Sequence, residues 1–171
     1  ILEGDCRTPK PALAVLECLA EVDAADVAPM ADVIASYLTE AEADVRRQAA
    51  ICITTLTEAD PADTVGTVPA LTKLLEDRTA SHHAAHSLSL LAEADPEAVT
   101  PAAPVLADAL TDDTLTDGAR LGATAALGRV ANRDPTVAVD LVDDVAALLE
   151  VENPKLRNNA AGLLWEVSRL H

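Results

Sequence analysis

A repeated aspartate motif constrains the fold of this chain more than any other feature of the sequence. Asp60, Asp95 and Asp134 each precede a proline, and Asp23 occupies the equivalent place with alanine after it. The intervals between these four aspartates are 37, 35 and 39 residues. A period of this length predicts stacked supersecondary units, each covering its neighbours, rather than one closed globule.

An apolar stripe with helical spacing precedes each aspartate, and His171 takes the aspartate's place in the last copy. Offsets of i, i+4 and i+7 lie on one face of an α-helix. The stripe predicts a buried row of Ala12, Ala49, Ala84, Ala123 and Ala160, then a row of Leu16, Ile53, Leu88, Leu127 and Leu164, then a row of Leu19, Leu56, Leu91, Val130 and Val167. We call these segments the second helices and expect them near residues 8–22, 45–59, 80–93, 117–132 and 155–169.

A first helix is expected between successive second helices. Its predicted core positions are Ile34, Leu71, Leu106 and Val145, followed by Leu38, Leu75, Leu110 and Leu149. Pro61, Pro96 and Pro135 suit the first helical turn, where the missing N–H has no intrahelical partner to lose. Pro69 and Pro104 are expected to kink the helix or delay its start. No run alternates apolar and polar residues, so we expect no sheet.

Residues 42–50 (Glu-Ala-Asp-Val-Arg-Arg-Gln-Ala-Ala) resemble the turn and second helix of HEAT repeats. Residues 154–164, with Asn-Ala-Ala-Gly inside them, also resemble armadillo repeats. The resemblance implies an all-α, right-handed α-α superhelix with four helix pairs plus one extra N-terminal helix. No Gly/Ser linker or low-complexity tract divides the chain, so we expect one domain over residues 1–171, with units at roughly 1–23, 24–60, 61–95, 96–134 and 135–171. In such stacks second helices line the concave side, and arginines like Arg46, Arg120 and Arg157 bridge to acidic turn residues.

The chain is strongly acidic, with 29 Asp and Glu against 12 Lys and Arg and a formal net charge of −17. It holds only three lysines and no phenylalanine. This composition resembles that of cytosolic proteins of halophilic archaea, in which concentrated salt screens repulsion between carboxylates. The alternative is an acidic module of an ordinary organism that binds a basic partner.

The cysteines and the hydropathy indicate a cytoplasmic protein. Cys6, Cys18 and Cys52 form no Cys-x-x-Cys pair, which argues for a reducing compartment and against a disulfide framework or a structural zinc site. No apolar run approaches a membrane span and no signal peptide is visible. The chain begins without methionine, so it is expected to be a processed or excised segment.

His82 and His86 are the only residues with a spacing that suggests a metal site, because i and i+4 share one helix face. No histidine is followed by glutamate, unlike the His-Glu pairs of the HEAT-like deoxyhypusine hydroxylases. Nucleic-acid binding by a HEAT-like protein requires a basic groove and aromatic contacts, which this composition disfavours. We therefore expect no catalytic residues, no metal and no cofactor. The alternative is a HEAT-like metal-binding protein or enzyme that uses His82 and His86.

The side of each second helix opposite the core stripe is the predicted binding surface. In the first three units it combines a basic edge, a floor of small or apolar residues and an acidic edge. Such a strip suits a peptide or helix of another protein, with Trp165 as an anchor. The leading hypothesis is a non-catalytic interaction or scaffold module that binds its partner through Lys10, Arg47, Ile51, Thr54, His82, His86, Ser89, Leu121, Asn158 and Trp165. The partner's identity and the oligomeric state are left open.

Overall fold

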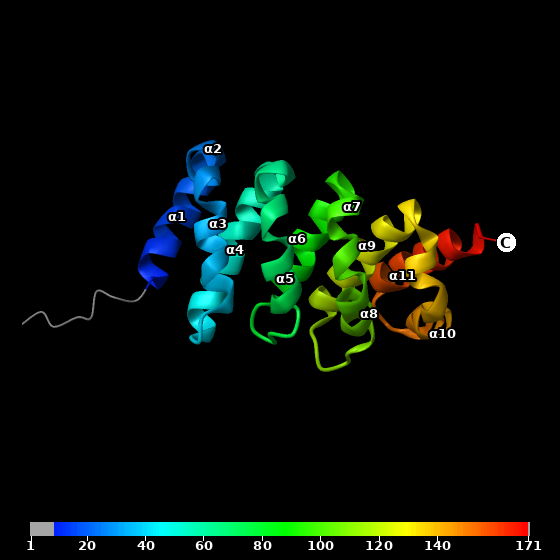
Figure 1. Ribbon diagram of the computed structural model, residues 1–171. Coiled ribbons are helices and arrows are strands. Elements are labelled where there is room, and N and C mark those ends of the chain that lie inside the picture. The colour runs from blue at the N-terminus through cyan, green and yellow to red at the C-terminus, as the bar shows by residue number, and fades with distance from the viewer. Residues whose placement is uncertain (1–8, 171) are drawn as a thin grey trace, which may run out of the picture.

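The computed structural model describes residues 9–170 as helices stacked in series, and no strand occurs among them (Figure 1). Cys6, His171 and the beginning of the predicted first unit lie outside the described residues. Five long second helices run along the stack, each within two residues of its expected boundaries. They are α1 (Lys10–Val22), α4 (Ala43–Ala59), α6 (Ser81–Ala94), α9 (Asp117–Arg133) and α11 (Pro154–Ser168).

The first helices are present but broken into short α and 3-10 segments. Prolines lie in the first turn of η1, α5, η4 and α8 and account for the breaks there, because a proline lacks the backbone donor that a continuing helix needs; the breaks before η2, α10 and η6 have no proline beside them. In order along the chain the segments are α2 (Ala24–Val27), η1 (Ala28–Met30), α3 (Ala31–Ser36) and η2 (Tyr37–Thr39); η3 (Pro61–Thr67) and α5 (Val68–Leu74); α7 (Pro96–Val99), η4 (Thr100–Ala102) and α8 (Ala103–Thr111); and η5 (Pro135–Leu141), α10 (Val142–Ala147) and η6 (Leu148–Glu150).

The repeated aspartates form the corner between a second helix and the next first helix. Asp23, Asp60 and Asp134 have an extended backbone, and the N–H of each of the four aspartates donates to a carbonyl in the last turn of the helix before it. Its side chain then caps the helix after it: Asp60 Oδ1 accepts from the Ala62 N–H at 2.9 Å, and Asp134 Oδ1 accepts from the Thr136 N–H at 3.0 Å. The motif therefore ends one helix and starts another.

The predicted core rows are confirmed for the middle units. Ala49, Ala84 and Ala123 are fully buried, as are Ile53 and Leu88. Alanine at this position permits close contact between helices, and Gly122 extends that contact further. A Cβ added to Gly122 would lie 2.7 Å from the Ala85 carbonyl carbon, so α6 and α9 approach each other too closely for any larger residue.

Burial at the two ends of the stack differs from the prediction. Ala12 and Leu19 are exposed, because these positions of a second helix face the first helix of their own unit and none precedes α1 in the described residues. Instead Leu13 and Ala20, which face α4, are buried. The prediction for Leu149 is also wrong, and Leu148 takes its place in the core; we attribute the shift to the tighter winding of the 3-10 segment η6. Leu164 is only half-buried, beside buried Leu163.

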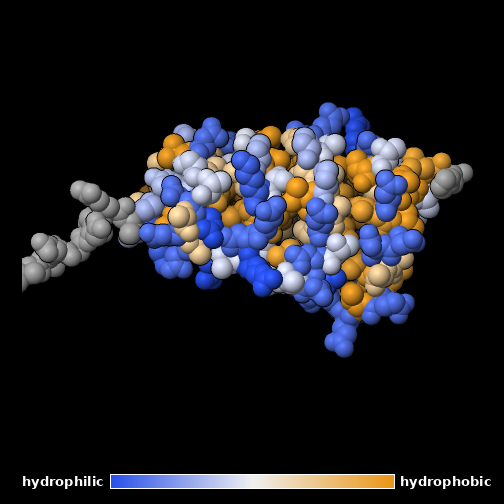
Figure 2. Space-filling model, turned by 60° about the horizontal axis from the view of Figure 1, so that its bottom comes forward, coloured by the Kyte–Doolittle hydropathy of each residue, from blue (hydrophilic) through white to orange (hydrophobic). Residues whose placement is uncertain are grey.

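Among residues 9–170 large exposed apolar residues occur only toward the two ends, within residues 15–33 and 139–170. Figure 2 shows the same tendency on one face, where hydrophobic colour gathers over the C-terminal part of the stack. A middle unit is covered on both sides, whereas an end unit has one uncovered side. Among residues 9–170 no helix combines the length and apolar character that crossing a bilayer requires.

Two of the three repeated arginines make different contacts from those expected. Arg46 bridges to the turn carboxylate of Asp77, with Nε 2.6 Å from Oδ2, as predicted, and also donates to the carbonyls of Glu40 and Ala41. Arg157 donates to the carbonyls of Val151 and Glu152. Arg120 donates to the carbonyl of Leu110. Arg46 and Arg157 therefore fasten the loop before their own helix, and Arg120 fastens the end of α8, mainly through backbone oxygen atoms.

Candidate functional site

The side chains of the predicted strip lie on one surface formed by the second helices, which we call the second-helix face. Arg47, His86, Asn158 and Trp165 are exposed there, and Trp165 retains 61% of its accessible surface. Ile51, His82 and Leu121 are half-buried, and the Lys10 ammonium contacts Asp44 at 2.6 Å. Most of the predicted residues are thus accessible from one side of the stack.

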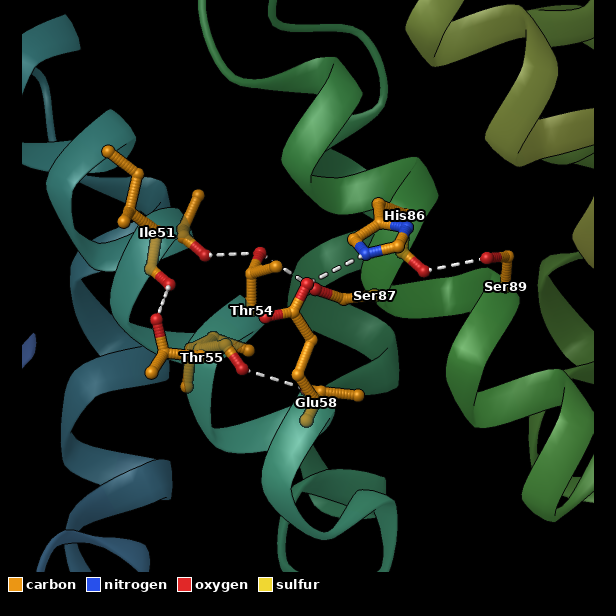
Figure 3. A network of polar contacts seen from close by, with 10 residues as sticks. Ile51, Thr54, Thr55, Glu58, His86, Ser87 and Ser89 are labelled. Atoms are coloured by element: carbon orange, nitrogen blue, oxygen red, sulfur yellow. Dashed lines mark hydrogen bonds and ion pairs between the residues drawn. The ribbon is translucent and has the colours of Figure 1, made fainter. Parts of the chain in front are cut away.

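Thr54 and Ser89 are buried, and their hydroxyls are already bonded. Thr54 Oγ1 donates to the Ala50 carbonyl at 2.8 Å and lies 3.0 Å from Ser87 Oγ on α6, while Ser89 Oγ donates to the His86 carbonyl (Figure 3). These bonds satisfy groups that are costly to bury unpaired. Thr54 and Ser89 therefore act mainly in packing, although the edge of Ser89 lines a groove described below.

Two of the three histidines of α6, His82 and His83, favour the neutral form. Burial, then the charge of Arg47, lowers the pKa of His82. Burial, followed by the proximity of His82 and Arg47, lowers the pKa of His83 to about 4. His86 Nε2 lies 3.0 Å from Glu58 Oε1, and Figure 3 shows this contact joining α6 to α4. Among residues 9–170 no group of three or more His, Cys, Asp or Glu side chains is arranged to hold a metal ion.

Two adjoining grooves hollow the second-helix face between α9 and α11, and the second of them extends to α6. One, of about 360 Å³, runs past Gly128, Arg129, Gly162 and Trp165. The other, of about 320 Å³, runs past His86, Leu121 and Lys155. The grooves meet at four residues that line both of them: Ala125, Arg129, Asn158 and Asn159. Of the predicted strip, the structure gathers His86, Ser89, Leu121, Asn158 and Trp165 at these grooves.

The remaining predicted residues, Lys10, Arg47, Ile51, Thr54 and His82, do not line these two grooves. They belong to α1, α4 and the first turn of α6, nearer the N-terminal end of the stack. The grooves therefore involve only the C-terminal part of the predicted strip.

Two carboxylates of the predicted acidic edge contact side chains of the following unit. Glu58 pairs with His86, and Glu93 accepts from Arg129 Nη2 at 2.8 Å. In the last unit Arg169 donates to the Asn132 amide oxygen and to Glu166, and its guanidinium carbon lies 5.5 Å from the Trp165 ring centroid. The edge thus links neighbouring units instead of presenting a row of free carboxylates.

Glycine is used in the groove without an evident packing reason. A Cβ added at Gly128 or Gly162 would have no neighbouring atom within 4 Å, unlike one at Gly122. Both glycines lie well inside helices, where glycine is less stable than alanine by about 0.5–1 kcal/mol. Sequence reasoning missed Arg129, Lys155 and Asn159 as groove residues. On each helix these residues lie next to the positions of the predicted strip, so a wider arc around each helix would have included them.

Comparison with solved structures shows the same fold over almost the whole chain. One engineered protein is similar with a TM-score of 0.78 and 21% identity over 98% of this chain and 76% of that chain. A second gives a TM-score of 0.79 and 18% identity over 94% and 74%. A structure of computationally designed armadillo repeat proteins for modular peptide recognition gives a TM-score of 0.78 and 16% identity over 93% and 75%. These matches confirm the predicted all-α superhelix of HEAT and armadillo type.

Comparison by sequence gives one family. Residues 21–155 match the family of Cnd1, the non-SMC mitotic condensation complex subunit 1. No curated protein matches the chain.

Proposed function

The chain belongs to the family of Cnd1, the non-SMC mitotic condensation complex subunit 1, and from this premise we propose that it is a non-catalytic protein-interaction module. The proposed ligand is a peptide or helix of another protein, bound on the second-helix face. The family takes its name from a subunit of a multi-protein complex, which favours a role in contacts between proteins. Stacked helical units offer long surfaces that suit such contacts.

The observation that carries this proposal is the pair of adjoining grooves between α9 and α11. Exposed Trp165 lies at one of them, and tryptophan contributes strongly where it becomes buried on binding. The two grooves adjoin and are open, and glycine and alanine line part of them between polar side chains, which suits an extended chain better than a compact small molecule. A designed armadillo protein made for peptide recognition shares the fold, and this similarity is consistent with the same use.

The proposed working environment is a reducing, salt-rich cytoplasm of a halophilic organism. Cys18 and Cys52 are free thiols in the described residues, which suits a reducing compartment. Twenty-nine acidic residues on a chain of this size repel one another less when salt is concentrated. We therefore expect the protein to bind its partner at concentrated salt, and binding experiments need that salt throughout.

A comparative affinity purification tests the proposed function. The bait is the full chain, used at high KCl in an extract of the organism that encodes it. Gly162→Leu places a side chain into the groove, where the structure offers open space, and Lys73→Glu changes a charge on α5 as the control. A partner retained by the wild type and by Lys73→Glu, but lost with Gly162→Leu, supports the proposal. A partner lost only with Lys73→Glu would place binding on the first helices instead.

A further inference from the structure

The grooves between α9 and α11 are lined by more cations than carboxylates, whereas the whole chain has far more carboxylates than cations. The whole chain has 29 acidic and 12 basic residues. The residues that line the two grooves include the cations Arg129 and Lys155 and only one carboxylate, that of Glu166. Glu166 is paired with Arg169 and Arg129 with Glu93, so these charges largely compensate one another, and Lys155 is the cation of the grooves without an ion pair among residues 9–170. An otherwise acidic molecule therefore presents a locally cationic groove.

Arg129 lies at the centre of this groove and keeps donors for a ligand. Only its Nη2 is engaged within the described residues, with Glu93 at 2.8 Å. The side chain of Arg129 remains about one-third exposed, at 34%. Guanidinium groups bind carboxylates through more than one N–H, so Arg129 can hold Glu93 and a second carboxylate together. Lys155, exposed on the first turn of α11, has no ion pair among the described residues and offers a second cation along the groove.

The floor of the groove leaves room for a polypeptide backbone. Gly128 and Gly162 lie on facing helices, and neither has a neighbour within 4 Å of an added Cβ. Glycine in the middle of a helix reduces helix stability, and one use that offsets this cost is close approach of a ligand backbone. Trp165 stands exposed at the same groove and provides an apolar contact.

We infer that the groove between α9 and α11 binds an acidic peptide segment of a partner protein. The inference rests on the proposed function and adds the chemistry of the ligand. Carboxylates of the segment contact Arg129 and Lys155, and its backbone lies over Gly128 and Gly162. Local attraction at the groove competes with long-range repulsion from the acidic surface, and salt weakens the long-range repulsion more. Binding is therefore expected at salt concentrations that would suppress a purely long-range attraction.

A random peptide library selected on the immobilised full chain at high KCl tests this inference. The retained peptides are expected to be enriched in Asp and Glu over the unselected library. One retained peptide is then synthesised and measured by fluorescence anisotropy. Lys155→Gln should weaken its binding about three- to tenfold, the loss expected for one charge-assisted contact. Lys73→Gln, which removes one cation from α5, should leave its affinity unchanged, and Gly162→Leu should abolish binding.

The outcomes separate this inference from the proposed function. Retained peptides that require an open groove but are enriched in Lys and Arg would overturn the acidic ligand and leave the interaction module standing. Retained peptides that all bind Gly162→Leu as well as they bind the wild type would overturn both, as would a library that yields no peptide. A single-stranded oligonucleotide that competes with the peptide and depends equally on Lys155 would assign the groove to nucleic acid.

Discussion

Gly122 and Gly128 lie six residues apart in α9, and alanine at these two positions should change stability in opposite directions. At Gly128 an added methyl group meets no atom within 4 Å, so only helix propensity changes. Replacing an interior helical glycine by alanine should then stabilise the protein by about 0.5–1 kcal/mol. Both substitutions lie in the same helix and add the same methyl group, so each is the control for the other.

At Gly122 the same methyl group would lie 2.7 Å from the carbonyl carbon, 2.8 Å from the Cβ and 2.9 Å from the carbonyl oxygen of Ala85. Two of these atoms belong to the backbone of α6, so no side-chain rotation relieves the contact. The helices must separate, and overpacking of this kind costs about 1–3 kcal/mol or more. After the gain in helix propensity, Gly122→Ala should still be less stable than the wild type by about 1–2 kcal/mol.

Thermal and urea unfolding followed by far-UV circular dichroism at one KCl concentration measures both effects. For a chain of this size 1 kcal/mol corresponds to about 2–4 °C in Tm. The Tm should rise for Gly128→Ala and fall for Gly122→Ala, with equal helical signal before unfolding. If Gly122→Ala were as stable as the wild type, α6 and α9 would not approach as closely as described. If Gly128→Ala lowered the Tm, the groove would be packed rather than open.

Three further predictions concern charge. His83 has a folded-state pKa of about 4, below its ordinary 6.5, so the neutral ring stabilises the fold above pH 6.5 and this contribution is lost as the pH falls toward 4. In urea unfolding at several pH values, the free energy of unfolding should therefore decline less with falling pH for His83→Gln than for the wild type. An equal decline would contradict the burial of this ring. Arg46→Ala removes the partly buried contact with Asp77 and two carbonyl bonds and should cost about 1.5–3 kcal/mol in denaturant unfolding. Arg133→Ala, which breaks only the exposed pair with Glu97, should cost less than about 1 kcal/mol, and equal losses would show that the Arg46 contacts add nothing. Finally, the Tm should rise as KCl is raised to molar concentrations, and an unchanged or lower Tm would remove the halophilic interpretation.

Periodicity predicted the second helices well because their burial depends on neighbours of the same kind. Ala49, Ala84 and Ala123 have equivalent surroundings, so one count from the aspartate locates all of them in the core. The method failed at Leu19, where no first helix of the same unit covers the side chain in the described residues. It also failed at Leu149, because a count that assumes α-helical spacing loses register where the chain winds as a 3-10 helix.

The candidate site was only partly predictable. Leu121, Asn158 and Trp165 were identified from the side of the helix opposite the core, and they do lie at the grooves. A wider arc around the helix would have included Arg129, but the presence of a groove beside it depends on how far neighbouring helices stand apart, and a single-helix projection carries no such information. The sequence likewise contains no sign that Gly122 is crowded and Gly128 is open, because that difference comes from the position of α6 relative to α9.

The close contact at Gly122 also has a mechanical consequence. α6 and α9 share the most extensive contact between helices of the described residues, whereas the contacts of α4 with α6 and of α9 with α11 are less extensive. A superhelix built in this way has one extensive helix–helix interface, between α6 and α9, with a less extensive and more compliant interface on each side of it. We therefore expect the stack to bend more easily on either side of the α6–α9 block. Since the grooves lie at the α9–α11 joint, a ligand seated in them would fix the curvature of the C-terminal part of the stack, and stretching the stack would change the width of its own binding groove.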